Sequence, residues 1–256
     1  MQPTPYAYIN ELLESLLAQM QKILGKKLIG LYLYGSLVWG DFDYDTSDID
    51  LLAALSSDLD EKEFEALQKM HADFADNHKD WDNRIEVQYF SLYGLKTFKS
   101  QATPMANISP GEPFHRIEAG KEWLMNWYFV QENGVTLYGP NPKTIIEPIT
   151  KEEFLQAVEE HAKAWREYVK RTMPSRPSQA YAILTMCRAL YTYKNGEQVS
   201  KRQAALWAEK ELPEWSSLIQ NALVWRDAWR NEHVDHYATY PETLRFVNFV
   251  IDQIVR

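Results

Sequence analysis

Two carboxylates and a Gly-Ser pair are the residues of this chain whose types and spacing could do chemistry. Gly35-Ser36 ends the apolar run LIGLYLY, and Asp48 and Asp50 begin a second apolar run, DIDLLAAL, twelve positions after Ser36. Alternate residues of a strand point to the same face, so both carboxylates project together. Two acids held that close repel each other unless a cation lies between them. The pattern therefore predicts a site for a divalent metal and a phosphate.

A third acid lies in the segment RIEVQYFSL (84–92), whose alternating pattern predicts another strand. On that strand Glu86 and Gln88 share one face. A third carboxylate near Asp48 and Asp50 would either join them as a metal ligand or act as a general base for an acceptor hydroxyl.

Together these residues suit a nucleotidyl transfer. That reaction needs metal ions to neutralise a triphosphate and to activate the attacking oxygen, and two metals held by carboxylates serve both sides of an in-line displacement. Magnesium fits because it accepts a few carboxylates and leaves its other positions to water and phosphate oxygens. We therefore expect Asp48 and Asp50 to bind Mg²⁺, as one ion or two. We expect Gly35 and Ser36 to bind the triphosphate through backbone N–H groups and a hydroxyl.

The segments that must position these residues alternate between helical and strand patterns. Helical periodicity marks 7–24 and 56–76, and short apolar runs mark strands at 28–34, 48–55 and 84–92. This order predicts a small α/β (α+β) domain built on a mixed sheet.

The middle of the chain carries weaker patterns. Residues 36–47 are expected to form a short turn and an acidic loop, and 93–115, with its prolines and Gly111, is expected to be irregular. A helix is predicted near 116–132. The Gly and Pro residues of GVTLYGPNP, which follows, are typical of a boundary.

From Thr150 onward the pattern is helical alone. Five segments at helical spacing, punctuated by prolines, follow one another: ITKEEFLQAVEEHAKAWREYVKR, QAYAILTMCRALYTYKN, SKRQAALWAEKEL, EWSSLIQNALVWRDAWR and TLRFVNFVIDQIVR. We therefore predict an α/β domain over residues 1–145 and an all-α helical bundle over residues 146–256.

The composition narrows the class of protein. The 256 residues carry a formal net charge of −9, which argues against a nucleic-acid binder with its basic stripe and is compatible with a cationic small substrate. No apolar run approaches the roughly 20 residues of a membrane helix, and the N-terminus lacks the features of a signal peptide. The single cysteine, Cys187, is expected to be a buried structural thiol, which fits a reducing cytoplasm. The sequence does not disclose the oligomeric state, and a monomer is the simplest expectation.

An ordered set of features resembles the polymerase-beta-like nucleotidyltransferase superfamily. The set is an apolar strand, Gly35-Ser36, Asp48-x-Asp50, a helix and a strand bearing Glu86. The resemblance implies that Asp48 and Asp50 bind magnesium and that Glu86 contributes to metal binding or base catalysis. P-loop and dinucleotide-binding folds are disfavoured, because the sequence contains neither GxxxxGK nor GxGxxG.

A second resemblance covers most of the chain, from about residue 28 to its end. ENGVTLYGPNP and the later AILTMCRALYTYKNGEQVSKRQAALWAEKELP are similar to the streptomycin/spectinomycin (aminoglycoside) adenylyltransferases. This resemblance implies an active site between the two domains, with Arg188 and Lys201 reaching the phosphates of ATP. Residues 93–115 do not align with the drug-contacting segment of those enzymes. Ser178 stands where streptomycin-modifying members carry an acid, which favours a spectinomycin-like acceptor.

We therefore expect a Mg²⁺-dependent adenylyltransferase that moves AMP from ATP to a hydroxyl of a small cationic acceptor, an aminoglycoside or aminocyclitol antibiotic. One alternative is a nucleotidyltransferase acting on a protein or a tRNA end, as in toxin–antitoxin modules. The large helical domain argues against it. Another alternative is a non-catalytic nucleotide-binding protein, and the presence of all three acids argues against that.

Two further features have simpler explanations. Trp39, beside the acidic loop, either lines the nucleotide or acceptor pocket or packs into the core. His233 and His236, with Glu232 and Asp235 beside them, have a spacing that a metal site can use, but in a loop they are more typical of a solvated turn.

Overall fold

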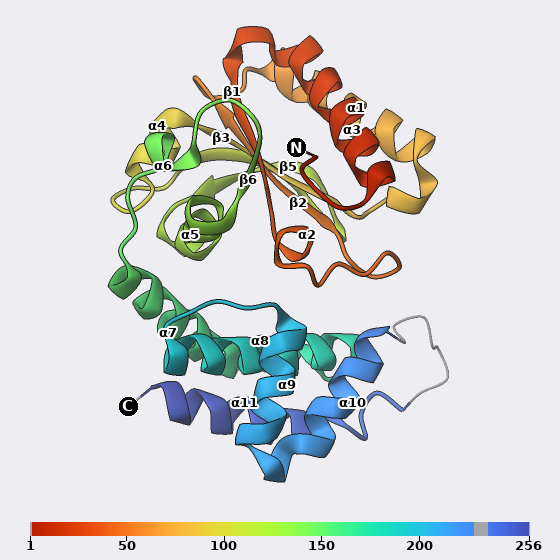
Figure 1. Ribbon diagram of the computed structural model, residues 1–256, viewed down its shortest axis with the longest axis vertical. Coiled ribbons are helices and arrows are strands. Elements are labelled where there is room, and N and C mark those ends of the chain that lie inside the picture. Colours follow the sequence, from red (N-terminus) through yellow and green to blue (C-terminus); the bar gives the residue numbers. More distant parts are fainter. Residues whose placement is uncertain (1, 228–234, 256) are drawn as a thin grey trace. The chain divides into compact units, whose positions relative to one another are not determined.

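The computed structural model describes residues 2–227 and 235–255 of the protein. The chain divides into two compact units, Met1–Ile149 and Thr150–Arg256 (Figure 1). The first unit contains a sheet covered by helices, and the described part of the second unit contains helices and no strand. The predicted fold class, an α/β domain followed by an all-α bundle, is confirmed.

A six-stranded mixed sheet forms the centre of the first unit, with the strand order β5-β4-β3-β2-β1-β6. The strands are β1 Leu28–Tyr34, β2 Ile49–Leu55, β3 Ile85–Ser91, β4 Thr103–Ser109, β5 Glu112–Ala119 and β6 Val135–Tyr138. Neighbouring strands β2 and β3 run parallel, and the other neighbours run antiparallel. Because β2 and β3 are parallel, their N-terminal ends, which carry the acids, meet at the same edge of the sheet.

Two long helices, α1 (Ala7–Leu24) and α3 (Glu61–Asn77), lie side by side over one face of this sheet (Figure 1). Their apolar stripes and the alternate residues of the strands form one core, in which Leu16 of α1, Leu33 of β1 and Phe74 of α3 are almost fully buried. Burying a side chain of this size stabilises the fold by about 1.5–3 kcal/mol. The polar side chains of β3, such as Glu86 and Gln88, lie on the face of the sheet turned away from α1 and α3.

The start of α3 follows a local sequence signal. The Asp60 carboxylate accepts the backbone N–H of Glu63, and Glu63 Oε2 accepts the backbone N–H of Asp60, both at 2.9 Å. Such a capping box is worth about 1 kcal/mol. Lys27, just before β1, also contacts Glu63 Oε2 at 2.6 Å, so this helix end is tied to the base of the sheet.

The opposite face of the sheet is partly covered by α4 (Leu92–Thr97) and α5 (Leu124–Asn133). Phe90 of β3 stacks on Trp127 of α5 with 5.7 Å between ring centroids. Phe90 alternates with Tyr89, which belongs to the core under α1 and α3. Because Glu86 and Gln88 share the face of Phe90, both acids of the β2–β3 pair lie on the α5 side of the sheet.

The segment 93–115 is not irregular, and the predicted helix near 116–132 begins too early. Strands β4 and β5 form a hairpin that extends to Ala119, and α5 begins only at Leu124. Pro104 and Pro113 stand at the second positions of their strands, where a missing N–H is tolerated near a strand end. The prolines that suggested an irregular loop are thus compatible with a hairpin, and pairing across strands overrides the local signal.

Smaller elements add detail to the sequence-based expectation. The short turn expected at the start of the segment 36–47 is a single helical turn, α2 (Ser36–Trp39), before the loop begins at Gly40. The boundary segment GVTLYGPNP contains edge strand β6, followed by the short α6 (Pro142–Ile145). Single turns of 3-10 helix occur at Gly25–Lys27, Lys79–Trp81, Lys121–Trp123, Val169–Thr172 and Pro213–Trp215.

The second unit is a bundle arranged around one central helix. Its helices are α7 Lys151–Tyr168, α8 Arg176–Asn195, α9 Lys201–Glu211, α10 Ser216–Asp227 and α11 Tyr240–Ile254. Helix α8 packs against the other four. Cys187, in the middle of α8, is fully buried, and burial raises the pKa of its thiol, so the prediction of a structural cysteine is confirmed. Within the described residues, none of the helices combines the length and apolar character needed to cross a membrane.

Candidate active site

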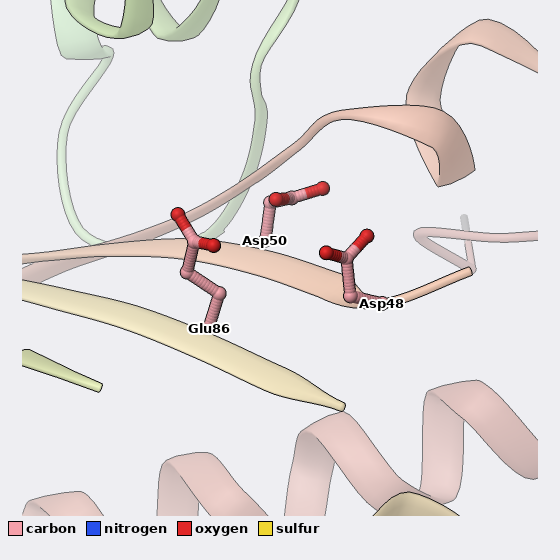
Figure 2. Close-up of side chains that lie close together, drawn as sticks. All are labelled: Asp48, Asp50 and Glu86. Atoms are coloured by element: carbon pink, nitrogen blue, oxygen red, sulfur yellow. The ribbon is translucent and has the colours of Figure 1, made fainter. Parts of the chain in front are cut away.

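Asp48, Asp50 and Glu86 come together at the N-terminal ends of two neighbouring strands. Asp50 is the second residue of β2 and Glu86 the second residue of β3, and the parallel register pairs them directly. Asp48 lies just before β2. One oxygen from each of the three carboxylates lies within 4.8 Å of the other two, and Figure 2 shows the side chains converging above the strands. The structure brings the three predicted acids together, and their roles in metal binding and catalysis stay a prediction.

This arrangement concentrates negative charge on partly buried groups. Two unit charges about 4–5 Å apart repel by about 3–4 kcal/mol at an effective dielectric constant near 20. All three acids are partly exposed, so water and a hydrated cation can reach them. Carboxylate oxygens at this spacing are the ligands that Mg²⁺ prefers, so the residues fit a divalent cation.

The Gly35-Ser36 turn lies directly against Asp50. Gly35 has a φ of 78°, a left-handed conformation that L side chains rarely adopt, and it precedes the first residue of α2. The space where a side chain would stand at Gly35 is filled by the Asp50 carboxylate. Glycine is thus required here for two reasons: its backbone conformation and its close approach to a predicted metal ligand.

Ser36 contributes a polar atom without a hydrogen-bond partner. Its Oγ is buried, and it makes no hydrogen bond to any residue that the structure describes. A buried hydroxyl left unpaired costs about 1–3 kcal/mol. A phosphate oxygen or a hydrated cation beside Asp50 would satisfy this group, which is the chemistry that the sequence pattern predicts for Ser36.

Arg84 is a supporting residue that the sequence-based reasoning missed. Its guanidinium donates to the backbone carbonyls of Ser47 and Tyr44, on the loop that leads into Asp48, and to that of Asp80 at 3.1 Å. The same group lies 4.5 Å from the ring centroid of Trp81. Arg84 therefore holds the acidic loop through fixed donors. In the sequence, the only indication of this role was the position of Arg84 directly before the strand that carries Glu86.

A buried polar network holds the Glu86 carboxylate. The sequence pattern predicted only that Gln88 lies on the same face of the strand as Glu86. The Gln88 amide Nε2 donates to Glu86 Oε1 at 2.8 Å and to Asn107 Oδ1 at 3.2 Å. The Tyr34 hydroxyl donates to Gln88 Oε1 at 2.7 Å. Burial, followed by the charges of Glu86 and Asp50, raises the pKa of Tyr34 well above 10, so this hydroxyl keeps its proton.

Two other features singled out in the sequence have structural surroundings. The Trp39 ring packs edge-to-face on Phe129, with 5.5 Å between centroids, and its contact with a ligand stays a prediction. His236 Nδ1 accepts the backbone N–H of Arg176 at 3.0 Å, which is a structural role. Glu232 and His233 lie outside the described residues.

Arg188 and Lys201, the predicted phosphate-binding residues, both belong to the second unit. Arg188 lies on α8, and Lys201 is the first residue of α9. Burial, and then the charges of Arg188 and Lys201, lowers the pKa of His161 to about 4, which places both cations near this histidine. Lys201 Nζ also lies 3.8 Å from the ring centroid of Tyr181. Their role toward a nucleotide stays a prediction.

The second unit also has an open pocket of ≈ 460 Å³ at the start of α8. Its lining residues combine three aromatic rings with a few polar groups: Trp165, Tyr168, Arg171, Thr172, Pro177, Ser178 and Tyr181. Ser178 brings a neutral hydroxyl to this wall where the resemblance described above would have an acid. The pocket therefore has aromatic surface for a ring-shaped ligand, but no carboxylate among its lining residues.

Comparisons with known proteins find similar sequences and a similar fold. Residues 144–253 match the family model described as "Aminoglycoside adenylyltransferase, C-terminal domain". The chain is 23% identical to an aminoglycoside (3'') (9) adenylyltransferase of Escherichia coli, over 98% of this chain and 96% of that protein. It is 27% identical to one of Rhizobium radiobacter, over 49% of this chain and 45% of that protein.

Among solved structures, the fold is similar to a spectinomycin adenyltransferase of Enterococcus faecialis, determined with ATP and spectinomycin. The TM-score is 0.73 at 16% sequence identity, and the match covers 96% of this chain and 99% of the other. At this identity the likeness establishes the fold of both units.

Proposed function

We infer that this chain, which belongs to the aminoglycoside adenylyltransferase family of nucleotidyltransferases, moves AMP from ATP to a hydroxyl of a small cationic acceptor. The observation that carries the proposal is the cluster of Asp48, Asp50 and Glu86 beside the Gly35-Ser36 turn. Three converging carboxylates next to an unpaired buried hydroxyl suit a metal-bound triphosphate. A purely structural role would not favour such crowding of like charges.

In the proposed reaction, the acceptor oxygen forms a bond to the α-phosphorus of ATP. The bond from that phosphorus to the oxygen bridging to the β-phosphorus breaks, and pyrophosphate leaves. Asp48 and Asp50 would hold Mg²⁺, and the bound metal would neutralise triphosphate charge. Glu86 would take the proton of the acceptor hydroxyl, or share in holding the metal.

The phosphates also need donors from the protein. Gly35 and Ser36 would supply a backbone N–H and a hydroxyl beside the metal ligands. We propose Arg188 and Lys201 as further phosphate ligands, as the resemblance of the α8–α9 segment to the adenylyltransferases implies, because both are cations that a polyphosphate can bind. Fixed positive groups of this kind stabilise the charge that develops during phosphoryl transfer.

For the acceptor, we propose an aminocyclitol of the spectinomycin type. Streptomycin carries guanidinium groups, which bind best to carboxylates. Ser178 offers a hydroxyl and no charge, and the pocket that it lines contains no acidic side chain. The E. faecialis protein of similar fold was determined with spectinomycin, which is why this compound heads the acceptor panel.

The direct test incubates the protein with ATP labelled at the α-phosphate, Mg²⁺ and a panel of aminoglycosides and aminocyclitols. Label on a drug is the expected result, with equimolar pyrophosphate released. Label on protein or tRNA would instead favour the toxin–antitoxin type of transferase, and ATP binding without any transfer would favour a nucleotide-binding protein. Asp58→Asn, which removes an exposed acid outside the cluster, serves as the control variant for changes in the site.

A further inference from the structure

The Glu86 carboxylate accepts a hydrogen bond from the side-chain amide of Gln88, and the neighbours of that amide determine its orientation. Gln88 is fully buried, and its Nε2 donates to Glu86 Oε1 at 2.8 Å. An ionised carboxylate only accepts hydrogen bonds, so the nitrogen of this amide must face Glu86. The oxygen must then face a donor, and the Tyr34 hydroxyl is that donor, at 2.7 Å.

The network joins residues of three strands, with β2 lying between β1 and β3. Tyr34 lies on β1, Gln88 on β3 and Asn107 on β4, where Gln88 and Asn107 are register partners. The Gln88 amide Nε2 also donates to Asn107 Oδ1, at 3.2 Å. With one acceptor and two donor contacts, the amide is hydrogen-bonded on both of its polar atoms and has no reason to rotate.

The geometry points to Gln88 as the positioning residue for Glu86, with Tyr34 fixing the orientation of the Gln88 amide. This inference rests on the proposed role of Glu86 in AMP transfer. The hydrogen bond to Oε1 directs the carboxylate toward Asp50, its register partner on β2. Gln88 and Tyr34 are each at most 4% exposed, so they act on the reaction through Glu86 and do not touch a substrate themselves.

Two matched controls in the same unit separate this role from a general packing role. Tyr32, two residues before Tyr34 on β1, is also a buried residue, and its hydroxyl donates to Pro140 O at 2.9 Å, away from the acids. Gln131 of α5 is also buried and donates to Glu147 O at 3.0 Å. Tyr32→Phe and Gln131→Met therefore delete the same chemical groups without touching Glu86.

We expect Gln88→Met to lower kcat about 10–100-fold, the usual cost of losing an outer-shell partner, with little change in KM for ATP. Tyr34→Phe should lower kcat less, and both control variants should stay within about twofold of the wild type. In the Glu86→Gln background, adding Gln88→Met should cause no further loss, because Gln88 acts through Glu86. Equal losses in Gln88→Met and Gln131→Met, or losses that multiply in the double variant, would overturn the inference.

A crystal structure of Gln88→Met gives a readout that needs no activity. We expect the Glu86 carboxylate to leave its position beside Asp50, while the backbone of β3 stays in place. An unchanged Glu86 conformer in that structure would contradict the positioning role. If the wild type transfers no AMP to any acceptor, the proposed function fails, and this crystallographic comparison still decides whether Gln88 positions Glu86.

Discussion

A side chain at Gly35 and the carboxylate of Asp50 would occupy the same space: a Cβ on Gly35 would lie 1.8 Å from Asp50 Oδ2. The two residues are fifteen positions apart in the sequence. Gly35 follows the last residue of β1, and Asp50 is the second residue of β2. The turn that is expected to bind phosphate and an acid that is expected to bind metal are therefore in direct contact. Because of this contact, any side chain at position 35 would displace the Asp50 carboxylate.

The first prediction concerns Gly35→Ala. Gly35 and Gly111 both have positive φ, 78° and 85°, but nothing lies within 4 Å of a Cβ on Gly111. Backbone strain alone should cost each alanine variant about 1–2 kcal/mol of unfolding free energy. Gly35→Ala should in addition displace Asp50 and lose AMP transfer. Urea unfolding and transfer assays on both variants check this, and an active Gly35→Ala would contradict it.

The second prediction concerns Asp50→Asn and divalent metal. This variant should lose AMP transfer by about 10³-fold or more, because several kcal/mol of transition-state stabilisation depend on the metal site. Mg²⁺ at ten times its Kd should stabilise the wild type by about 1.4 kcal/mol and should not stabilise the variant. In EDTA the variant should unfold at the same temperature as the wild type or above it, since one like charge is gone. Thermal unfolding with and without Mg²⁺ measures both effects, and wild-type activity in Asp50→Asn would refute the metal assignment.

The third prediction concerns Arg84→Lys. The lysine keeps the charge but loses the planar set of donors that holds the carbonyls of Ser47 and Tyr44. We expect a loss of about 1–2 kcal/mol in stability and a weaker affinity for Mg²⁺, by about tenfold, because the loop before Asp48 loosens. Arg116→Lys is the control: Arg116 lies 4.1 Å from the ring centroid of Phe64 and pairs with Glu61 on the outer surface. Equal metal affinity in Arg84→Lys and Arg116→Lys would show that the loop needs no such support.

The fourth prediction concerns acid stability and His71. Burial lowers the pKa of His71 to about 4, whereas the unfolded chain titrates near 6.5. Between these values the unfolded state binds more protons, so stability falls as the pH is lowered from about 6.5 to about 4. At pH 5 the loss relative to pH 8 should be about 2 kcal/mol from this residue.

His71→Gln should remove that part of the pH dependence while keeping a polar partner for the Tyr89 hydroxyl, which lies 2.8 Å from His71 Nε2. The measurement is urea unfolding of wild type and variant at pH 8 and pH 5. His115→Gln, on strand β5, is the control for replacing a histidine elsewhere in the same unit. An identical pH dependence in wild type and His71→Gln would exclude His71 as its source.

The fifth prediction concerns Ser178→Asp. A carboxylate in the aromatic pocket at the start of α8 would provide the charge that a guanidinium group prefers. We expect this variant to gain adenylylation of streptomycin, by about tenfold in kcat/KM or more, over the wild-type rate. Thr150 caps α7 through its side chain, so Thr150→Asp keeps a capping acceptor and adds an acid outside the residues that line the pocket. A gain in both variants would point to a general charge effect and not to the pocket.

Much of the chemistry was readable from local patterns. The spacing of Gly35-Ser36 from Asp48 and Asp50, and the alternation that placed Glu86 and Gln88 on one face, are properties of short segments. Strand geometry alone then determines which side chains project together. The helices that the structure describes in the second unit were also readable, because helical periodicity and proline breakers are local signals.

The hairpin of β4 and β5 was not readable in this way. Its prolines and Gly111 are typical of an irregular loop when each position is taken alone. The strands form because Gln88 of β3 pairs with Asn107 of β4, and because β4 in turn pairs with β5. Pairing energies between strands belong to contacts that no single segment contains.

The sequence by itself determined the inventory of the site: three acids, a glycine in a turn and a hydroxyl. Only the tertiary structure decided that Asp50 and Glu86 are register partners, that Arg84 holds the acidic loop and that Gln88 and Tyr34 hold Glu86. The physical reason is that strand register and buried hydrogen bonds depend on which segments pack together. A shift of one residue would turn every side chain of a strand to the other face, and local propensity cannot specify that choice.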